Sequence, residues 1–261
     1  MQAQAGEVVK VQAPKIELKR RTFTFRVKRY DPKTGSYRWS EYKVEVTNRQ
    51  TVLDALLKIK ATQDPTLAVR YSCRMGICGS CAMVINGVPR LACETKPFDL
   101  GTDVIVLEPL SNFPPIKDLV VDMDEFFRKH RSVKPWLIRR DEEEQFEKLE
   151  SYYPQTEDQL MEYLEFAYCI KCGACYAACP MVFLNKNYLG PQALAAAYRW
   201  SADNRDEGYV LRLKIVDSDN GVWSCHYSGT CSKVCPKGVD PALAINLLKK
   251  SLLTGKAPGK R

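Results

Sequence analysis

Eleven cysteines occur in this chain of 261 residues, and all of them fall into three groups. A disulfide framework does not suit them, because their number is odd and a chain of this length can bury a core without covalent cross-links. Cysteines gathered at short, regular spacings are typical of metal ligands. Their distribution therefore predicts metal centres.

The first group consists of Cys73, Cys78, Cys81 and Cys93, in "CRMGICGSCAMVINGVPRLAC". C-x4-C-x2-C followed by a distant fourth cysteine is the spacing of plant-type 2Fe–2S ligands. A loop around such a cluster turns backbone amides toward the sulfurs, and Gly76 and Gly79 allow the close approach and the positive φ that this needs. A zinc site is the alternative, but zinc ligands usually occur as paired C-x2-C units.

The second and third groups are copies of one pattern. "CIKCGACYAACP" at 169–180 and "CHYSGTCSKVCP" at 225–236 match position for position with an offset of 56 residues, including the final Cys-Pro. The match fails at one metal-ligand position, because Cys172 corresponds to Ser228. Two zinc sites would leave both the repeat and its prolines unexplained.

In two-cluster bacterial ferredoxins, each run of this kind gives three ligands to one cluster and its fourth cysteine to the other. Applied to this chain, the rule predicts a 4Fe–4S centre held by Cys169, Cys172, Cys175 and Cys235, and a second centre held by Cys179, Cys225 and Cys231. Ser228 stands at the remaining corner of the second centre, which favours a 3Fe–4S cluster. A serine oxygen holding a labile fourth iron is the alternative. These sets account for every cysteine.

The elements that position the first group read as a small sheet with one helix. Phe23, Phe25 and Val27 alternate with polar residues as in a half-buried strand, and a turn at 31–35 leads to a second strand at 42–46. The segment 51–61 has the apolar pattern of a helix, with Thr51 as a possible cap. A second hairpin turns at Asn86-Gly87, and another strand is expected at 103–110.

After about residue 120 the strand patterns largely stop. The segments 157–169, 191–200 and 240–253 read as helices, the last with Asp240 as N-cap and Pro241 in the first turn. The fold class predicted is therefore α+β, with a sheet-containing half followed by a helical half.

Composition excludes several classes of function. The formal net charge is +8, but basic residues are spread along the chain, so solvation or an acidic protein partner is favoured over nucleic acid. No apolar run approaches the length of a membrane span, and the first residues lack a signal or transit pattern, so we expect a cytosolic protein. No nucleophile–base constellation or phosphate loop is present, and His130 is expected at the surface.

These motifs, together with "GVWSCHYSGTCSKVCPKGVDP", closely resemble the iron–sulfur subunit of succinate dehydrogenase and fumarate reductase over about residues 16 to 253. The resemblance implies a β-grasp plant-type ferredoxin domain at 16–118, an all-helical two-cluster bacterial-type ferredoxin domain at 119–253, and tails at 1–15 and 254–261. It also implies a flavoprotein partner carrying FAD, and membrane anchor subunits that bind haem or quinone. The complex would lie at the cytoplasmic face of the cell membrane.

In this family, electrons run from flavin through the 2Fe–2S, 4Fe–4S and 3Fe–4S centres to quinone, so we expect a subunit of succinate dehydrogenase (quinone), EC 1.3.5.1 type, inactive alone. The same subunit of a fumarate reductase is the near alternative. The iron–sulfur subunit of another flavoprotein oxidoreductase and a zinc-binding nucleic-acid module are distant ones.

By motif position, the resemblance places Pro180, His226 and Lys249 at the quinone pocket. Histidine can relay protons near neutral pH, which suits a quinone that takes up protons with electrons. The segment 181–184 lacks the tryptophan that ubiquinone-reducing members often carry after Cys-Pro, which leaves menaquinone open.

Overall fold

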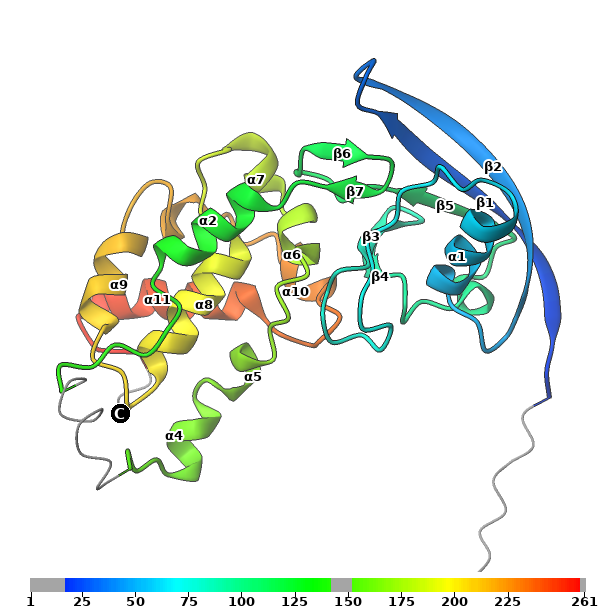
Figure 1. The fold of residues 1–261 in the computed structure, drawn as a ribbon. Coiled ribbons are helices and arrows are strands. Elements are labelled where there is room, and N and C mark those ends of the chain that lie inside the picture. The colour runs from blue at the N-terminus through cyan, green and yellow to red at the C-terminus, as the bar shows by residue number, and fades with distance from the viewer. Residues whose placement is uncertain (1–16, 142–151, 259–261) are drawn as a thin grey trace, which may run out of the picture.

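The computed structural model describes residues 17–141 and 152–258. A sheet-containing half and a helical half lie side by side (Figure 1). The predicted N-terminal tail at 1–15 lies outside the described residues, as do residues 259–261 of the predicted C-terminal tail. The domain boundaries at 118 and 253 stay predictions.

The first half is a mixed sheet covered by one helix, the β-grasp arrangement that was predicted. Its elements are β1 Arg20–Asp31, β2 Ser36–Thr47, α1 Val52–Thr62, β3 Ala82–Ile85, β4 Val88–Leu91 and β5 Val104–Glu108. The strand order is β2-β1-β5-β3-β4, in which β1 and β5 are parallel and the other neighbours antiparallel.

Local sequence accounts for these elements. Alternate residues of β1 are buried, and α1 begins with a capping box in which the Thr51 hydroxyl accepts a hydrogen bond from the Asp54 amide at 3.2 Å. Between β3 and β4, Asn86 and Gly87 have φ angles of 49° and 78°, the two positive values that a tight hairpin turn with the right-handed strand twist requires.

Short elements connect the two halves. The one-turn helix η1 Pro97–Leu100 precedes β5, and a small hairpin of β6 Pro115–Lys117 and β7 Val120–Val121 follows it. The helical half then contains α2 Asp124–Ser132, α4 Glu157–Met161, α5 Leu164–Ala167, α6 Ala174–Ala177, α7 Pro180–Leu184, α8 Pro191–Ala202, α9 Tyr209–Val216, η2 Val222–Ser224, α10 Thr230–Lys233 and α11 Pro241–Thr254.

The predicted helix at 191–200 is α8, and the one at 240–253 is α11, which Asp240 caps by accepting from the Leu243 amide at 2.9 Å. The helix predicted at 157–169 is instead the two short helices α4 and α5. The chain leaves helical geometry at Tyr163 (φ −132°), whose buried ring packs against Arg199 and whose hydroxyl donates to Gln155 Oε1 at 2.9 Å. Tertiary packing of this one side chain overrides the helical pattern.

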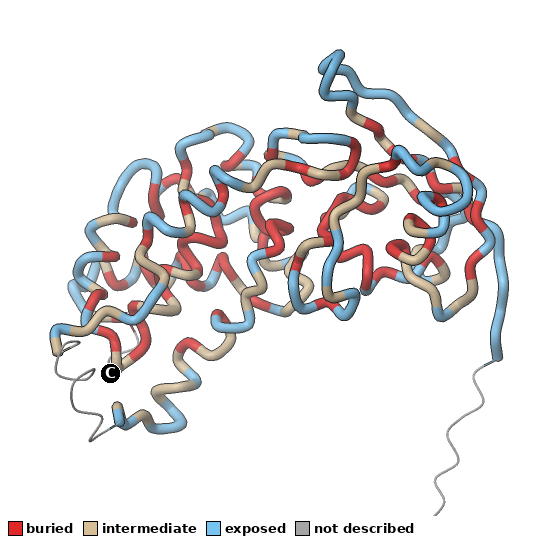
Figure 2. The backbone as a smooth tube through the Cα atoms, viewed as in Figure 1, coloured by how far each residue is buried: buried red, intermediate tan, exposed pale blue. Residues whose placement is uncertain are grey.

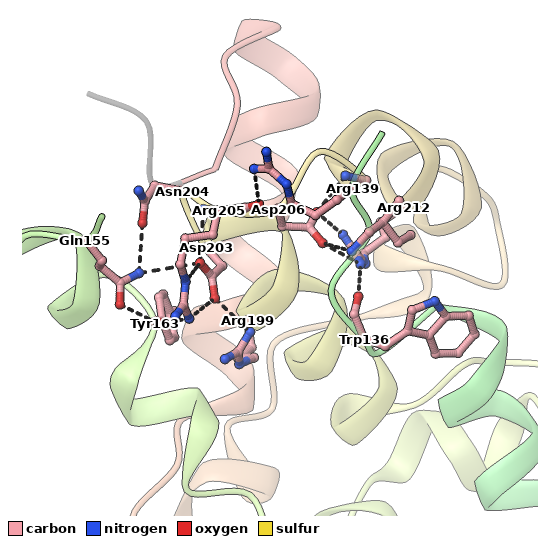
Figure 3. A network of polar contacts seen from close by, with 12 residues as sticks. Trp136, Arg139, Gln155, Tyr163, Arg199, Asp203, Asn204, Arg205, Asp206 and Arg212 are labelled. Atoms are coloured by element: carbon pink, nitrogen blue, oxygen red, sulfur yellow. Dashed lines mark hydrogen bonds and ion pairs between the residues drawn. The ribbon is translucent and has the colours of Figure 1, made fainter. Parts of the chain in front are cut away.

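A network of buried and partly buried ion pairs anchors the loop after α8 (Figure 3). Arg212 and Asp206 are fully buried and joined at 2.5 Å, and Arg212 also donates to the carbonyls of Lys134 and Trp136. Nearby, Asp203 pairs with Arg199 and Arg205. The network therefore ties the segment after α2 to the segment between α8 and α9.

The two halves share one hydrophobic core. The same buried cluster includes Phe25 of the sheet and Tyr176 and Leu248 of the helical half. Figure 2 shows buried backbone in both halves. Polar contacts reinforce the junction: the Asn112 amide donates to three carbonyls at the end of α6, and Lys237 pairs with Glu94 at 2.9 Å. The relative placement of the cysteine groups thus follows from shared packing.

Candidate metal centres

The first cysteine group is assembled by one loop and one hairpin. Cys73 and Cys78 lie in the irregular segment before β3, whereas Cys81 and Cys93 flank the β3–β4 hairpin. Because Ala82 pairs with Leu91, the hairpin brings Cys81 and Cys93 side by side, and the Cys93 amide donates to Cys81 Sγ at 3.4 Å.

The loop backbone turns its amides toward sulfur, as the sequence predicted. The Cys73 amide donates to Cys78 Sγ and the Met75 amide to Cys73 Sγ, both at 3.5 Å. Positive φ at Gly76 and Gly79 permits this curl. A side chain at Gly76 would collide with Glu94, because a Cβ there would lie 1.9 Å from its carboxylate oxygen.

The thiols of this loop differ in acidity. Although burial opposes ionisation of Cys78, hydrogen bonds from the Ser80 side chain and the Cys73 backbone lower its pKa to about 6. Burial raises the pKa of Cys81 to about 12. A thiolate is the form that binds metal. Because its pKa is lower, Cys78 loses its proton and reaches that form more easily than Cys81.

The 56-residue repeat is also a repeat of backbone geometry. Helix α6 of the first copy corresponds to α10 of the second, and the two helices pack together. Gly173 and Gly229 precede them with φ of 82° and 70°, and Lys171 and Tyr227 have φ of 56° and 58°. Non-glycine residues with positive φ are uncommon, so a matched pair indicates that both copies form the same cysteine-bearing turn.

Four cysteines line one small cavity between the two copies: Cys169, Cys172, Cys175 and Cys235. Apolar neighbours, including Ile170, Ala195 and Val239, complete its walls. Burial raises the pKa of Cys175 well above its usual value, and the charges of its neighbouring thiols add to this effect. Cys235 comes from the second run, so the structure places the fourth cysteine of that run with the first three of the other.

The remaining three cysteines form a second group. Burial raises the pKa of Cys231 to about 11, and the nearby thiols of Cys179 and Cys225 act in the same direction. Tyr188 is buried beside this group; burial is the main cause of its raised pKa, and the charges of Cys225, Cys179 and Cys231 act in the same direction. Cys179 belongs to the first run, which completes the reciprocal exchange.

Ser228 occupies the position that Cys172 has in the first copy, but its environment differs. Cys172 is buried, whereas Ser228 is exposed and its hydroxyl lies 3.2 Å from that of Thr230. Thr230 in turn donates to the Ala178 carbonyl at 3.0 Å. The Ser228 hydroxyl is therefore hydrogen-bonded within its own turn.

The three groups lie in series. A Cβ at Gly79, in the first loop, would lie 2.8 Å from the Cα of Cys172, so the loops of the first and second groups are in van der Waals contact. Cys175 of the second group and Cys231 of the third belong to one buried cluster with Ala242. The arrangement provides a continuous path from one cysteine group to the next.

The predicted quinone-pocket residues lie beside the third group. Pro180 follows Cys179 and His226 follows Cys225, and both are exposed. Lys249 is half-buried on α11, where it donates to the Cys225 carbonyl at 3.0 Å and lies 5.8 Å from the Trp223 ring. Trp223, an exposed indole two residues before Cys225, was not singled out from the sequence.

His130, which was expected at the surface, is only partly exposed. Its ring is half-buried, and Nδ1 lies 3.1 Å from the Nε2 atom of Gln192. Burial, with a smaller contribution from the charge of Lys171, lowers the pKa of His130 to about 4. Gln192 is 2% exposed and lines the four-cysteine cavity, and sequence reasoning missed it because no motif marks a glutamine in a helix.

The donor sets fit iron–sulfur clusters. The first two groups offer thiol sulfur, backbone amides aimed at sulfur or apolar walls, and glycines where a side chain would collide with a neighbour; the third offers two buried thiols and one half-buried thiol. Among the described residues, no three His, Cys, Asp or Glu side chains converge as the ligands of a single metal ion would. Within 17–141 and 152–258, no helix has the length and apolar character needed to cross a bilayer.

Comparisons with known proteins agree with this picture. Residues 24–128 match the model of a 2Fe–2S iron–sulfur cluster binding domain, and residues 165–239 match that of a 4Fe–4S dicluster domain. The fumarate reductase iron–sulfur subunit of Haemophilus influenzae is 44% identical over 228 residues, which cover 84% of this chain and 89% of that protein.

A mitochondrial succinate dehydrogenase [ubiquinone] iron–sulfur subunit of Oryza sativa is 42% identical over 233 residues, covering 88% of this chain and 82% of the relative. In structure, a chain of the Mycobacterium smegmatis Sdh1 complex in its apo form matches with a TM-score of 0.79 and 28% identity, covering 90% of this chain and 97% of that one. The chain therefore belongs to the family of iron–sulfur subunits of succinate dehydrogenases and fumarate reductases.

Proposed function

We propose that this chain is the iron–sulfur electron-transfer subunit of a succinate:quinone oxidoreductase. It carries electrons between the FAD of a flavoprotein partner and a membrane quinone, and it has no activity alone. The observation that supports this most directly is the serial contact of the three cysteine groups, with Gly79 against Cys172 and Cys175 beside Cys231. A chain with such an arrangement is suited to conduction rather than to substrate chemistry.

The proposed ligands follow the three groups. Cys73, Cys78, Cys81 and Cys93 would hold a 2Fe–2S cluster, Cys169, Cys172, Cys175 and Cys235 a 4Fe–4S cluster, and Cys179, Cys225 and Cys231 a 3Fe–4S cluster. When bound, such clusters supply one-electron carriers. The chain itself supplies thiolates, amide donors to sulfur and burial, which set each reduction potential.

The third centre is proposed to have three irons because Ser228 is exposed and hydrogen-bonded to Thr230. A hydroxyl is also a weaker ligand for iron than a thiolate at neutral pH, since its proton is much harder to remove. Both considerations disfavour an iron at that corner.

The quinone end is proposed to lie next to this centre. Pro180 and His226 are exposed directly beside two of its cysteines, and the Lys249 ammonium group is held by the Cys225 carbonyl. Membrane anchor subunits would cover this surface, and the complex would sit at the cytoplasmic face of the membrane. His226 and Lys249 could then supply protons to a reduced quinone.

The same subunit in a quinol:fumarate reductase is the second candidate. The relative from Haemophilus influenzae and another from Mycobacterium tuberculosis, both 44% identical, carry the fumarate reductase name. The two functions differ in the direction of net electron flow, which depends on the flavoprotein and the quinone potential.

Low-temperature electron paramagnetic resonance of the membrane complex, oxidised and then treated with succinate, tests the proposal. An oxidised three-iron centre gives a signal, whereas oxidised 2Fe–2S and 4Fe–4S centres are silent. We expect a signal in the oxidised sample that disappears with succinate. A silent oxidised sample would refute the three-iron assignment. The second candidate would be favoured if succinate left the signal unchanged while fumarate oxidised the quinol-reduced complex.

A further inference from the structure

Gln192 is a polar side chain in a place where polarity is costly. It is 2% exposed near the start of α8, and it is one of the residues that line the cavity of Cys169, Cys172, Cys175 and Cys235. Its Oε1 atom is buried without a hydrogen-bond partner among the described residues. Burying a polar atom without a partner is unfavourable, so a retained glutamine needs a compensating role.

The other end of the carboxamide is fully engaged. Nε2 lies 3.1 Å from His130 Nδ1, and the same side chain lines the cavity beside Cys169, whose pKa it lowers as a hydrogen-bond donor. A carboxamide nitrogen carries two hydrogens, and a metal-bound thiolate sulfur can only accept. The nitrogen must therefore face Cys169, with its second hydrogen directed to the imidazole.

His130 is suited to fix this orientation. It projects from α2, which packs against α8, and its ring is half-buried. The low pKa of about 4, caused by burial and by the Lys171 charge, keeps the ring neutral at physiological pH. A neutral ring with its proton on Nε2 leaves Nδ1 free to accept from Gln192.

We propose that His130 positions the Gln192 carboxamide to donate a hydrogen bond to the Cys169 sulfur, and that this bond raises the reduction potential of the centre held in the four-cysteine cavity. The inference rests on the proposed ligand set. Reduction adds one electron to the centre without a proton, so negative charge on the sulfurs increases. A donor aimed at sulfur stabilises the reduced state more than the oxidised state.

The experiment is a redox titration of the four-iron signal by electron paramagnetic resonance in the intact membrane complex. Gln192→Met removes the donor while keeping chain length, and we expect the reduced-to-oxidised ratio at a fixed potential to fall about tenfold, a shift of about 59 mV to lower potential for a one-electron couple. His130→Phe should shift the potential in the same direction by less. His130→Asn, which restores an acceptor near the position of Nδ1, should return it toward the wild-type value.

Two further variants test the specificity of the effect. Tyr188→Phe removes the hydroxyl that contacts Cys225 of the other group and should leave the potential of the four-iron centre unchanged. The double variant Gln192→Met/His130→Phe should match Gln192→Met alone, because the histidine acts through the amide.

An unchanged potential in Gln192→Met with an intact signal would overturn the inference and leave the ligand set standing. Absence of any four-iron signal in the wild-type complex would instead overturn the ligand set. If Gln192→Met fails to assemble its cluster, the pair His130→Phe and His130→Asn decides, since equal potentials in these two variants would overturn the positioning role.

Discussion

The contact between Gly79 and Cys172 allows a sharp test of how the two cluster loops are held together. In Gly79→Ala, the added methyl group would lie 2.8 Å from both Cα and Cβ of Cys172 and 3.1 Å from the Ile170 carbonyl oxygen. Backbone atoms cannot rotate away, so one loop must move by several tenths of an ångström. Overpacking of this kind costs about 1–3 kcal/mol.

Backbone strain adds to the steric cost and needs its own control. Gly79 has a φ of 75°, a left-handed conformation that costs a residue with a side chain roughly 1–2 kcal/mol. Gly87→Ala provides the matched control, because Gly87 has a φ of 78° but no atom lies within 4 Å of its added methyl group. The difference between the two variants therefore isolates the inter-loop contact.

The assay is thermal unfolding of the complex, followed by loss of the cluster absorbance of this subunit. We expect Gly79→Ala to be less stable than Gly87→Ala by about 2 kcal/mol, which is roughly 4–8 °C in apparent Tm. Because Cys172 is one of the proposed ligands, Gly79→Ala should also lower the content of the four-iron centre. Equal Tm values and equal iron content in the two variants would refute the inferred contact.

Three other predictions concern separate parts of the chain. Ser228→Cys should convert the three-iron signal of the oxidised complex into a silent four-iron centre, whereas Ser228→Ala should keep the signal; a Ser228→Cys complex that retains it would contradict the assignment. Arg212→Met leaves the Asp206 carboxylate buried without its ionic partner and should lower the free energy of unfolding by about 3–5 kcal/mol. Urea unfolding measures this change, and a loss below about 1 kcal/mol would contradict burial of the pair. The pKa of His130 is lowered from 6.5 to about 4 in the folded state, so between these pH values the unfolded state binds the proton and the folded state does not. The free energy of unfolding should therefore fall as pH drops from about 6.5 to 4. His130→Phe should flatten this dependence, and an unchanged pH profile in the variant would argue against burial of the ring.

Local elements were readable from the sequence because their causes are local. The Thr51 cap needs only Asp54 three residues away, and the β3–β4 turn needs only Asn86 and Gly87. The break in the helix expected at 157–169 could not be predicted from local sequence in this way. Its break depends on Tyr163 contacting Arg199 and Arg205, more than 30 residues away in the chain.

The sequence by itself determined which cysteines belong together. Spacing and the 56-residue repeat specify the three groups, because the turns that carry the cysteines are short and their glycine positions recur in both copies. Ser228 was also visible at once as the exception within that repeat.

Only the tertiary structure decided what surrounds those cysteines. The contact of Gly79 with Cys172 and the placement of Gln192 and His130 around Cys169 join residues that are 23 to 93 positions apart. Such neighbours depend on how the sheet half packs on the helical half and how α2 packs on α8, and no local pattern records that packing. The physical reason is that spacing along the chain sets which thiols can meet in one group, whereas long-range packing sets the hydrogen bonds and the burial around each group.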